Sequence, residues 1–253
     1  MRTFLVQLLR EVRSIFYTPV AYVVMAMFAA LMGFNFQTAF TVLNQQPSDV
    51  TIIETTFVNV IFIFVFAITT SLITMRAFSE EFRMGTIEML TTAPVTDWQV
   101  VLAKFFGALL FYIVLFVPTV AFFAIFHYVS GGAPVAKSVE AIGSTYLILI
   151  LIGMLFISIG IFASVLVRDQ VNAAVISISV TIVYLWLPLM LARLLNMTDP
   201  RVTAATEFVS PIAHLSDFTK GLVDSRRIVW YVSVTTVFLV LTHHVFHSRK
   251  LKS

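Results

Sequence analysis

The sequence predicts an all-α membrane protein with six transmembrane helices, an N-terminal interfacial helix, a short cytoplasmic helix and an extracytoplasmic helical connection before the last span. Hydrophobic residues make up 59% of the 253 residues and charged residues only 11%, whereas a soluble domain carries about 25% charged residues. The apolar residues gather in six long runs, and the charges lie between these runs. A soluble chain of this length would need far more polar surface, so the bilayer is the expected solvent.

Each apolar run is long enough to span a bilayer, which requires about 17–25 mostly apolar residues. None of the runs contains Asp, Glu, Lys or Arg, so a carboxylate proton relay through the membrane is not expected. The six runs are Val20–Phe40, Phe57–Thr74, Phe105–Phe126, Tyr146–Val167, Val171–Leu191 and Val229–Val245. We therefore interpret residues 1–253 as one transmembrane domain.

Residues 1–17 have the pattern of an amphipathic helix that lies in the membrane interface before the first span. Their apolar residues fall on one helical face, and most of their charged residues fall elsewhere. Pro19, which biases Thr18 away from the helical conformation, favours a break at this point. The alternative is that residues 1–17 simply extend the first spanning helix.

The basic residues predict that both termini face the cytoplasm. Segments on the N-terminal side of the membrane hold ten of the sixteen Lys and Arg residues, and the short connection after the first span holds none. This is the bias of cytoplasmic loops. The ten residues are Arg2, Arg10, Arg13, Arg76, Arg83, Lys104, Arg168, Arg249, Lys250 and Lys252.

The connections on the other side of the membrane differ in kind. Thr41–Thr56 is polar and short, and His127–Thr145 is interpreted as a flexible loop because it contains Gly and Pro. Residues 192–228 form the longest connection, and a structureless loop of that length is unusual. We expect an extracytoplasmic helical cap there, or short helices that dip into the outer leaflet.

Small residues form stripes on the fourth and fifth runs, which are joined by a tight turn at Arg168–Gln170. The stripes comprise Gly153, Gly160 and Ser164 on the fourth run and Ala173, Ser177 and Thr181 on the fifth. Such stripes let helix backbones approach closely. They are compatible with internal packing, a dimer interface or a substrate path, and internal packing is favoured.

Catalytic motifs are absent from the sequence. None of the nine glycines is followed by Lys, so there is no nucleotide-binding P-loop, and no HExxH or GxSxG motif occurs. His243 and His247 have the i, i+4 spacing of metal ligands, but neither Cys nor a carboxylate accompanies them. We favour interfacial polar residues for this pair and expect no catalytic, cofactor-binding or metal-binding site.

The segment Ser79–Gln99 is one of the few clusters of charge. Ser79 is expected to cap a helix over residues 79–93, with Glu80 and Glu81 in its first turn, where acidic groups interact well with the helix dipole. Met84, Ile87 and Leu90 would then form an apolar stripe.

Pro94 ends this helix, and a new helix is expected to begin after Thr96. Thr96 and Gln99 have the spacing of a capping box, and Val95 can pack against Val100. The segment is therefore interpreted as a short helix, a break and a restart into the third span. It could be a surface helix that stabilises the bundle, or a docking element for a cytoplasmic protein.

The run SEEFRMGTIEMLTTAPVTDWQVVLAKFFG resembles the cytoplasmic segment of ABC-2 transporter permeases. Their pattern is E-E-x-R-x-G-T-x-E-x-L-x-x-x-P followed by a Lys before the next span, and Arg76 upstream also fits. Ala103 stands where the family often has Gly. The matching positions are Glu80, Glu81, Arg83, Gly85, Thr86, Glu88, Leu90, Pro94 and Lys104.

Two further stretches resemble the gliding-motility-like and nitrous-oxide-reductase-maturation-like branches of this family. They are the turn at Arg168–Gln170 and the segment Ser210–Tyr231 before the last span.

The resemblance implies the permease subunit of an ATP-binding-cassette exporter in the plasma membrane, which in bacteria is the inner membrane. Two permease subunits, identical or related, would pair, and each would dock a separate cytoplasmic ATPase that binds ATP and Mg. The chain itself would hold no cofactor and no nucleic acid. Residues 79–93 would be the coupling helix that contacts the ATPase.

Within that helix we expect Glu81, Arg83 and Glu88 to make polar contacts with the ATPase. Gly85 would allow close approach, and the apolar stripe would supply hydrophobic contact. Charged residues of the connection could meet an extracytoplasmic partner protein or form a solvated face; they are Asp217, Lys220, Asp224, Arg226 and Arg227. The rival hypothesis is a membrane scaffold that tethers a cytoplasmic protein without transport, and a metal- or haem-handling protein ranks third.

Overall fold

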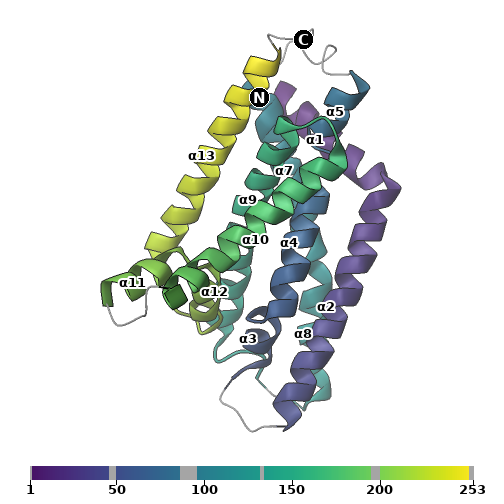
Figure 1. Ribbon diagram of the computed structural model, residues 1–253. Helices are drawn as coiled ribbons and strands as arrows, with labels where there is room; N and C mark the ends of the chain where they lie inside the picture. Colours follow the sequence, from purple (N-terminus) through teal and green to yellow (C-terminus); the bar gives the residue numbers. More distant parts are fainter. Residues whose placement is uncertain (1, 46–49, 86–95, 132–133, 195–199, 251–253) are drawn as a thin grey trace.

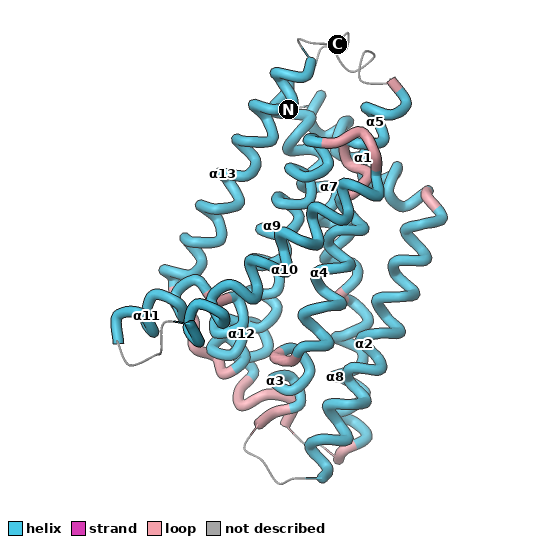
Figure 2. The backbone as a smooth tube through the Cα atoms, in the orientation of Figure 1, coloured by secondary structure: helices cyan, strands magenta, loops and turns pink. Residues whose placement is uncertain are grey.

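The computed structural model describes residues 2–45, 50–85, 96–131, 134–194 and 200–250, and these residues contain α-helices and no strand (Figures 1 and 2). The helices that we call the long helices run roughly side by side along the bundle, and the other helices lie at its two ends (Figure 1). The long helices are α2 (Pro19–Gln45), α4 (Val60–Thr74), α7 (Asp97–Leu115), α8 (Val117–Val129), α9 (Val139–Leu166), α10 (Gln170–Leu194) and α13 (Ser225–Lys250). The others are α1 (Arg2–Tyr17), α3 (Ile52–Phe57), α5 (Ser79–Met84), α11 (Pro200–Val209) and α12 (Pro211–Thr219).

The prediction of six membrane-spanning segments is confirmed. Six helical segments of the described chain are long and apolar enough to cross a bilayer, and each overlaps one of the predicted runs. The third of these segments combines α7 and α8. The chain therefore has the architecture of a multi-pass membrane protein.

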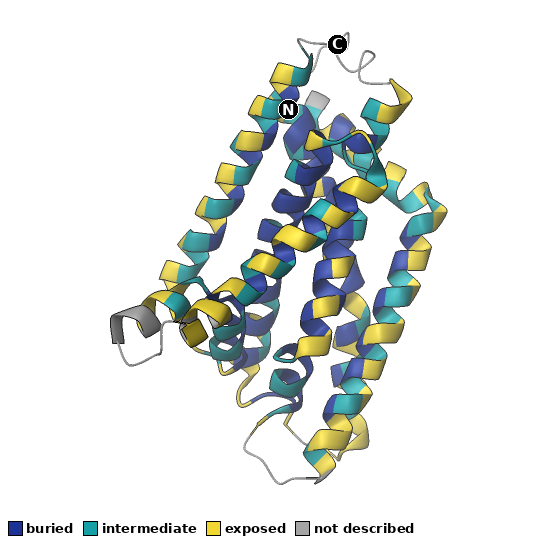
Figure 3. Cartoon of the chain, in the orientation of Figure 1, coloured by how far each residue is buried: buried dark blue, intermediate teal, exposed yellow. Residues whose placement is uncertain are grey.

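Helix α9 is the centre of the bundle. It packs against α4, α7, α10, α12 and α13, and Figure 3 shows that it is largely buried, whereas α2 and α13 expose one side along much of their length. An apolar residue occupies nearly every position of α9. A helix that is apolar all round is expected in the interior, where every face meets another element.

The small-residue stripes serve packing inside the chain. A Cβ atom added to Gly160 would lie 2.0 Å from Thr74 Oγ1 and 3.1 Å from Ser177 Oγ, so α9, α4 and α10 approach one another at this glycine. The hydroxyls of Ser71 and Ser177 are hydrogen-bonded at 2.8 Å. Ala173 and Thr181 are fully buried as well. Internal packing, the favoured interpretation, therefore accounts for these residues.

The third apolar run is divided at Pro118. Helix α7 ends at Leu115, and α8 begins at Val117 with Pro118 in its first turn. The proline ring lacks an N–H group and clashes with the preceding turn, so it begins a new helix more readily than it continues one. The predicted third span is present, and it consists of these two consecutive helices.

The connection Thr41–Thr56 contains more helix than its polar composition indicates. Helix α2 continues to Gln45, and α3 begins after Thr51, whose hydroxyl accepts a hydrogen bond from the Glu54 N–H. The next span begins at Val60 instead of Phe57, because the Asn59 side chain caps it by accepting a hydrogen bond from the Phe62 N–H. Asn59 also donates to the buried Asn35 at 2.8 Å, which ties this corner to α2.

The predicted break after residue 17 is present. Helix α1 ends at Tyr17, and α2 begins at Pro19. Helix α1 packs mainly against α7 and also contacts α2. Its position in the membrane interface remains a prediction.

The long connection before the last span is helical, as expected, and consists largely of α11 and α12. Helix α12 packs on α9 and presents His214 to the interior, where its Nδ1 lies 2.9 Å from the Tyr231 hydroxyl. Burial, reinforced by the positive charge of Arg227, lowers the pKa of His214 to about 4 from its ordinary value of 6.5. The folded chain therefore holds this imidazole neutral at neutral pH.

The neutral state of His214 predicts that acid destabilises the fold. In the unfolded chain the imidazole titrates near 6.5, so its full contribution to stability is present above that pH. This contribution is lost as the pH falls from 6.5 to about 4. The free energy of unfolding thereby decreases by up to about 3 kcal/mol. We expect the thermal unfolding midpoint to fall more steeply between pH 7.5 and 5 for the natural chain than for His214→Gln, which cannot titrate. Equal slopes for the two proteins would show that His214 does not carry this dependence.

Both termini lie at the same end of the bundle as α5, and α3, α11 and α12 lie at the opposite end (Figure 1). The turn between α9 and α10 also lies at the α5 end, where Arg249 of α13 donates a hydrogen bond to the Leu166 carbonyl. The segments that the sequence assigned to the cytoplasm are therefore together at one end of the molecule.

Candidate functional site

Helix α5 begins differently from the prediction. Phe78 is its N-cap, and Ser79 is the first helical residue, with a buried side chain whose hydroxyl donates to the Met75 carbonyl. Ser79 is therefore not the capping residue. The Ser164 hydroxyl of α9 accepts hydrogen bonds from the backbone N–H groups of Phe78 (2.9 Å) and Ser79 (3.0 Å). A residue 85 positions away thus supplies the cap that the local sequence was expected to provide.

Helix α5 also ends earlier than predicted. Gly85 adopts a left-handed conformation with φ of 68° and ends the helix after Met84, because glycine adopts this conformation without steric cost. The continuous helix expected over residues 79–93 is therefore interrupted at Gly85. Thr86, Ile87, Glu88, Leu90 and Pro94 lie outside the described residues.

Beneath α5, three charged residues from three helices form what we call the Lys104 cluster: Lys104, Glu11 and Glu81. Lys104 Nζ lies 2.7 Å from Glu81 Oε1 and 3.4 Å from Glu11 Oε2. The lysine side chain is only 4% exposed, and its ammonium group also lies 5.2 Å from the centre of the Phe78 ring. An ammonium with two carboxylates and an aromatic ring around it has the partners that a buried charge requires.

The close approach of α1 to α7 makes this cluster possible. A Cβ atom on Gly107 would lie 3.2 Å from Glu11 Cβ, so the glycine lets α1 lie close to α7 just beyond Lys104. Sequence reasoning identified Lys104 and Glu81 but missed Glu11. The only feature of the sequence that pointed to Glu11 was its acidic side chain in an otherwise basic amphipathic helix.

Residues in the last turns of α13 contact the first residues of α7. Asp97 accepts hydrogen bonds from Lys250 (2.9 Å) and contacts His247 Nδ1 (2.8 Å), and the neighbouring Trp98 ring stacks on His243 at 4.3 Å. The histidines at this end therefore have partners of their own. Among the described residues no group of three or more potential ligands could hold a metal ion.

The restart of the helix is also visible. The Thr96 backbone is extended, α7 begins at Asp97, and the Thr96 N–H donates to Gln99 Oε1 at 3.3 Å.

Helix α5 also contacts α13, because the Arg249 guanidinium of α13 lies 5.0 Å from the centre of the Phe82 ring. Helix α5 is thus connected to α1, α7, α9 and α13 at its base.

The far end of α5 is more exposed than its base. Arg83, Met84 and Gly85, which we call the α5 tip, are all exposed, and Met84 is 60% exposed. Glu80 and Glu81 are only partly exposed. The described part of α5 therefore has an exposed tip on a firmly packed base.

A model of a protein family described as "ABC-2 family transporter protein" matches residues 5–251. This chain belongs to the ABC-2 transporter family. No curated protein matches the sequence. Permeases of this family are typically non-catalytic membrane subunits that form dimers and act with an ABC ATPase.

The family assignment makes the chain an ABC transporter permease. Of the permease motif positions, the structure describes Glu80, Glu81, Arg83, Gly85 and Lys104, and it brings all five to the base or tip of α5. Glu81 faces Lys104, whereas Arg83 and Gly85 lie on the exposed tip. The assignment of the permease to a branch of the family remains a prediction.

Proposed function

We propose that this permease is the membrane subunit of an ATP-driven exporter, in which a separate cytoplasmic ABC ATPase docks on the α5 tip. Two permease subunits pair, and each receives one ATPase subunit that binds ATP and Mg. The α5 end of the bundle faces the cytoplasm, which agrees with the surplus of basic residues in the segments at this end. The substrate moves outward when the ATPase subunits close.

The observation that carries this proposal is the combination of an exposed tip and a fixed base in one short helix. Force applied to the tip reaches α1 and α7 through the Lys104 cluster and reaches α9 through Ser164. Because α9 contacts four of the other long helices, a displacement of α5 is passed to the centre of the bundle. ATP can shift the permease between two states only if the ATPase binds the tip differently in each.

The contacts of Glu81 alter the role that we assign to it. Its Oε1 atom is engaged by Lys104 at 2.7 Å, and its side chain is only 16% exposed. We therefore propose that Glu81 holds α5 in place for docking, and that Arg83 and Met84 contact the ATPase directly. The predicted contacts of Ile87, Glu88 and Leu90 lie outside the described residues.

The docking role of Arg83 is tested by measuring ATPase activity in a reconstituted complex of the permease with candidate P-loop ATPases from the same genome. We expect Arg83→Ala to reduce permease-stimulated ATP hydrolysis about tenfold, the effect of losing one charge-assisted hydrogen bond in a protein interface. Arg168→Ala is the matched control, because Arg168 is exposed at the same end of the bundle.

Equal activity of the natural permease and Arg83→Ala would show that Arg83 does not dock the ATPase. A stable complex in which the permease never changes ATP hydrolysis would favour the scaffold hypothesis instead.

A further inference from the structure

A pocket of about 510 Å³ lies between α1, α2, the α4–α5 turn and α7, at the α5 end of the bundle. Small-molecule sites typically occupy roughly 300–1,000 Å³. The charged groups that line it are Arg10, Glu11, Arg76, Glu80, Glu81 and Lys104. The pocket is thus large enough for a small polar group with part of an apolar chain.

Most of these charges are already paired, but two polar groups of opposite character are not. Lys104 and Arg10 form ion pairs with the carboxylates of the Lys104 cluster. Arg76 lines the pocket with a partly exposed side chain and forms no ion pair with the residues that the structure describes. Glu80 likewise forms no ion pair within the described chain.

A ligand that carries both charges could form a charge-assisted hydrogen bond with each of these two residues. An anionic group would accept from Arg76, and an ammonium group would donate to Glu80. A purely anionic ligand would leave the acidic groups unsatisfied, and a purely cationic one would leave Arg76 unsatisfied. The pocket therefore suits a zwitterion.

The apolar lining shows how the rest of such a ligand would lie. Val24, Leu72 and Phe111 come from the spanning helices α2, α4 and α7, and the charges come from α1, α5 and the adjoining ends of these spans. One wall of the pocket is thus polar and lies toward the end of the bundle, whereas the other is apolar and follows the spans. This gradient matches an amphiphile in the membrane.

We propose that the pocket binds a phospholipid whose headgroup carries a phosphate and a primary ammonium. The phosphate accepts from Arg76, the ammonium donates to Glu80, and the first carbons of an acyl chain lie along Val24, Leu72 and Phe111. Since α1 and α5 both contribute to the wall, the bound lipid contacts the helix that we propose for ATPase docking. The binding itself requires no ATPase and is tested on the permease alone.

The test is native mass spectrometry of the purified full chain with equal concentrations of dioleoyl phosphatidylethanolamine, phosphatidylcholine and phosphatidylglycerol. We expect the ethanolamine lipid to give the most abundant adduct. Arg76→Gln should lower its occupancy about tenfold, the effect of losing one charge-assisted hydrogen bond. Arg76→Lys, which retains the charge but lacks Nε, should bind with intermediate occupancy and keeps the test valid if the glutamine variant misfolds.

Arg13→Gln is the matched control, since Arg13 is exposed on α1 and does not line the pocket. Equal losses in Arg76→Gln and Arg13→Gln would overturn the proposal, because general attraction to the membrane would explain both. Equal binding of phosphatidylcholine would also overturn it, since a trimethylated ammonium has no N–H to donate to Glu80. Glycerophosphoethanolamine or inorganic phosphate that binds as well as the lipid would show that the apolar wall plays no part and would contradict the assignment to an amphiphile.

Discussion

Replacing Lys104 by Met is expected to cost the folded permease roughly 3–5 kcal/mol, because it leaves two carboxylates without their shared counter-charge. Glu11 and Glu81 both point at Lys104 Nζ, at 3.4 and 2.7 Å, and their side chains are 13% and 16% exposed. Methionine fills a similar volume, so the loss would arise from charge and not from a cavity. We expect a much lower thermal unfolding midpoint in detergent at neutral pH.

A compensating variant separates this electrostatic effect from a packing defect. A triple variant that combines Glu11→Gln, Glu81→Gln and Lys104→Met removes all three charges. Replacing a complete buried ion group often changes stability little. The triple variant should therefore recover most of the lost stability. If Lys104→Met were as stable as the natural chain, or if the triple variant were no better than the single one, the Lys104 cluster would not hold α1, α5 and α7 together.

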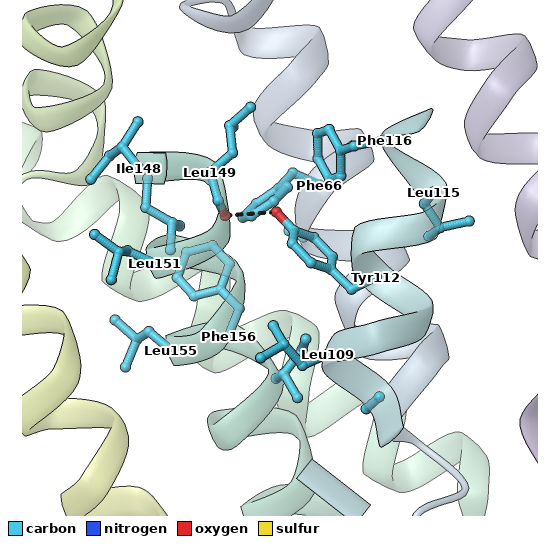
Figure 4. Close-up of a cluster of buried hydrophobic side chains, with 14 of the residues drawn as sticks. Phe66, Leu109, Tyr112, Leu115, Phe116, Ile148, Leu149, Leu151, Leu155 and Phe156 are labelled. Carbon is cyan, nitrogen blue, oxygen red and sulfur yellow. Dashed lines mark hydrogen bonds between the residues drawn. The ribbon is translucent and has the colours of Figure 1, made fainter. Parts of the chain in front are cut away.

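The second large effect is expected at Gly153, where α9 meets α7. A Cβ atom there would lie 2.4 Å from Tyr112 Cε1 and 2.5 Å from Tyr112 Cζ. The tyrosine ring cannot move away, because its hydroxyl donates to the Leu149 carbonyl at 2.7 Å and its ring packs against Phe66 and Phe116 (Figure 4). We expect Gly153→Ala to destabilise the chain by about 3 kcal/mol, at the upper end of the usual cost of overpacking.

Substitutions of Tyr112 provide the control for this prediction. Tyr112→Leu removes the two ring carbons and the hydroxyl oxygen that the added methyl group would meet, so it should rescue Gly153→Ala in part. Tyr112→Phe retains the colliding ring carbons and should give no rescue. Thermal unfolding of the single and double variants measures both effects, and equal behaviour of the two double variants would refute the steric explanation.

The spans could be predicted from the sequence because each depends on the hydrophobicity of one continuous segment. The break before Pro19 and the restart at Thr96 were likewise visible in local residues. The helical character of residues 192–228 followed from length and apolar content, and α11 and α12 agree with it.

The contacts that hold α5 could not be predicted in the same way, since they join residues far apart in the sequence. Ser164 caps α5 across 85 positions, and Glu11 reaches Lys104 across 93. No local pattern selects these partners, because a small polar residue on a buried helix face has many possible neighbours. Position 85 was a different case: a glycine is a common end of a helix, but the apolar stripe of Met84, Ile87 and Leu90 favoured continuation.

The natural chain contains no cysteine, so a single thiol at the α5 tip gives the most direct test of docking. Met84→Cys, in a complex with the ATPase, should crosslink to that subunit through a thiol-to-amine reagent, and the yield should change when ATP is added. Leu222→Cys is the control, because Leu222 is 63% exposed and follows α12 at the opposite end of the bundle. We expect a crosslink from Met84→Cys alone. A complex that co-purifies without this crosslink, or equal crosslinking from both positions, would contradict the claim that the ATPase docks on α5.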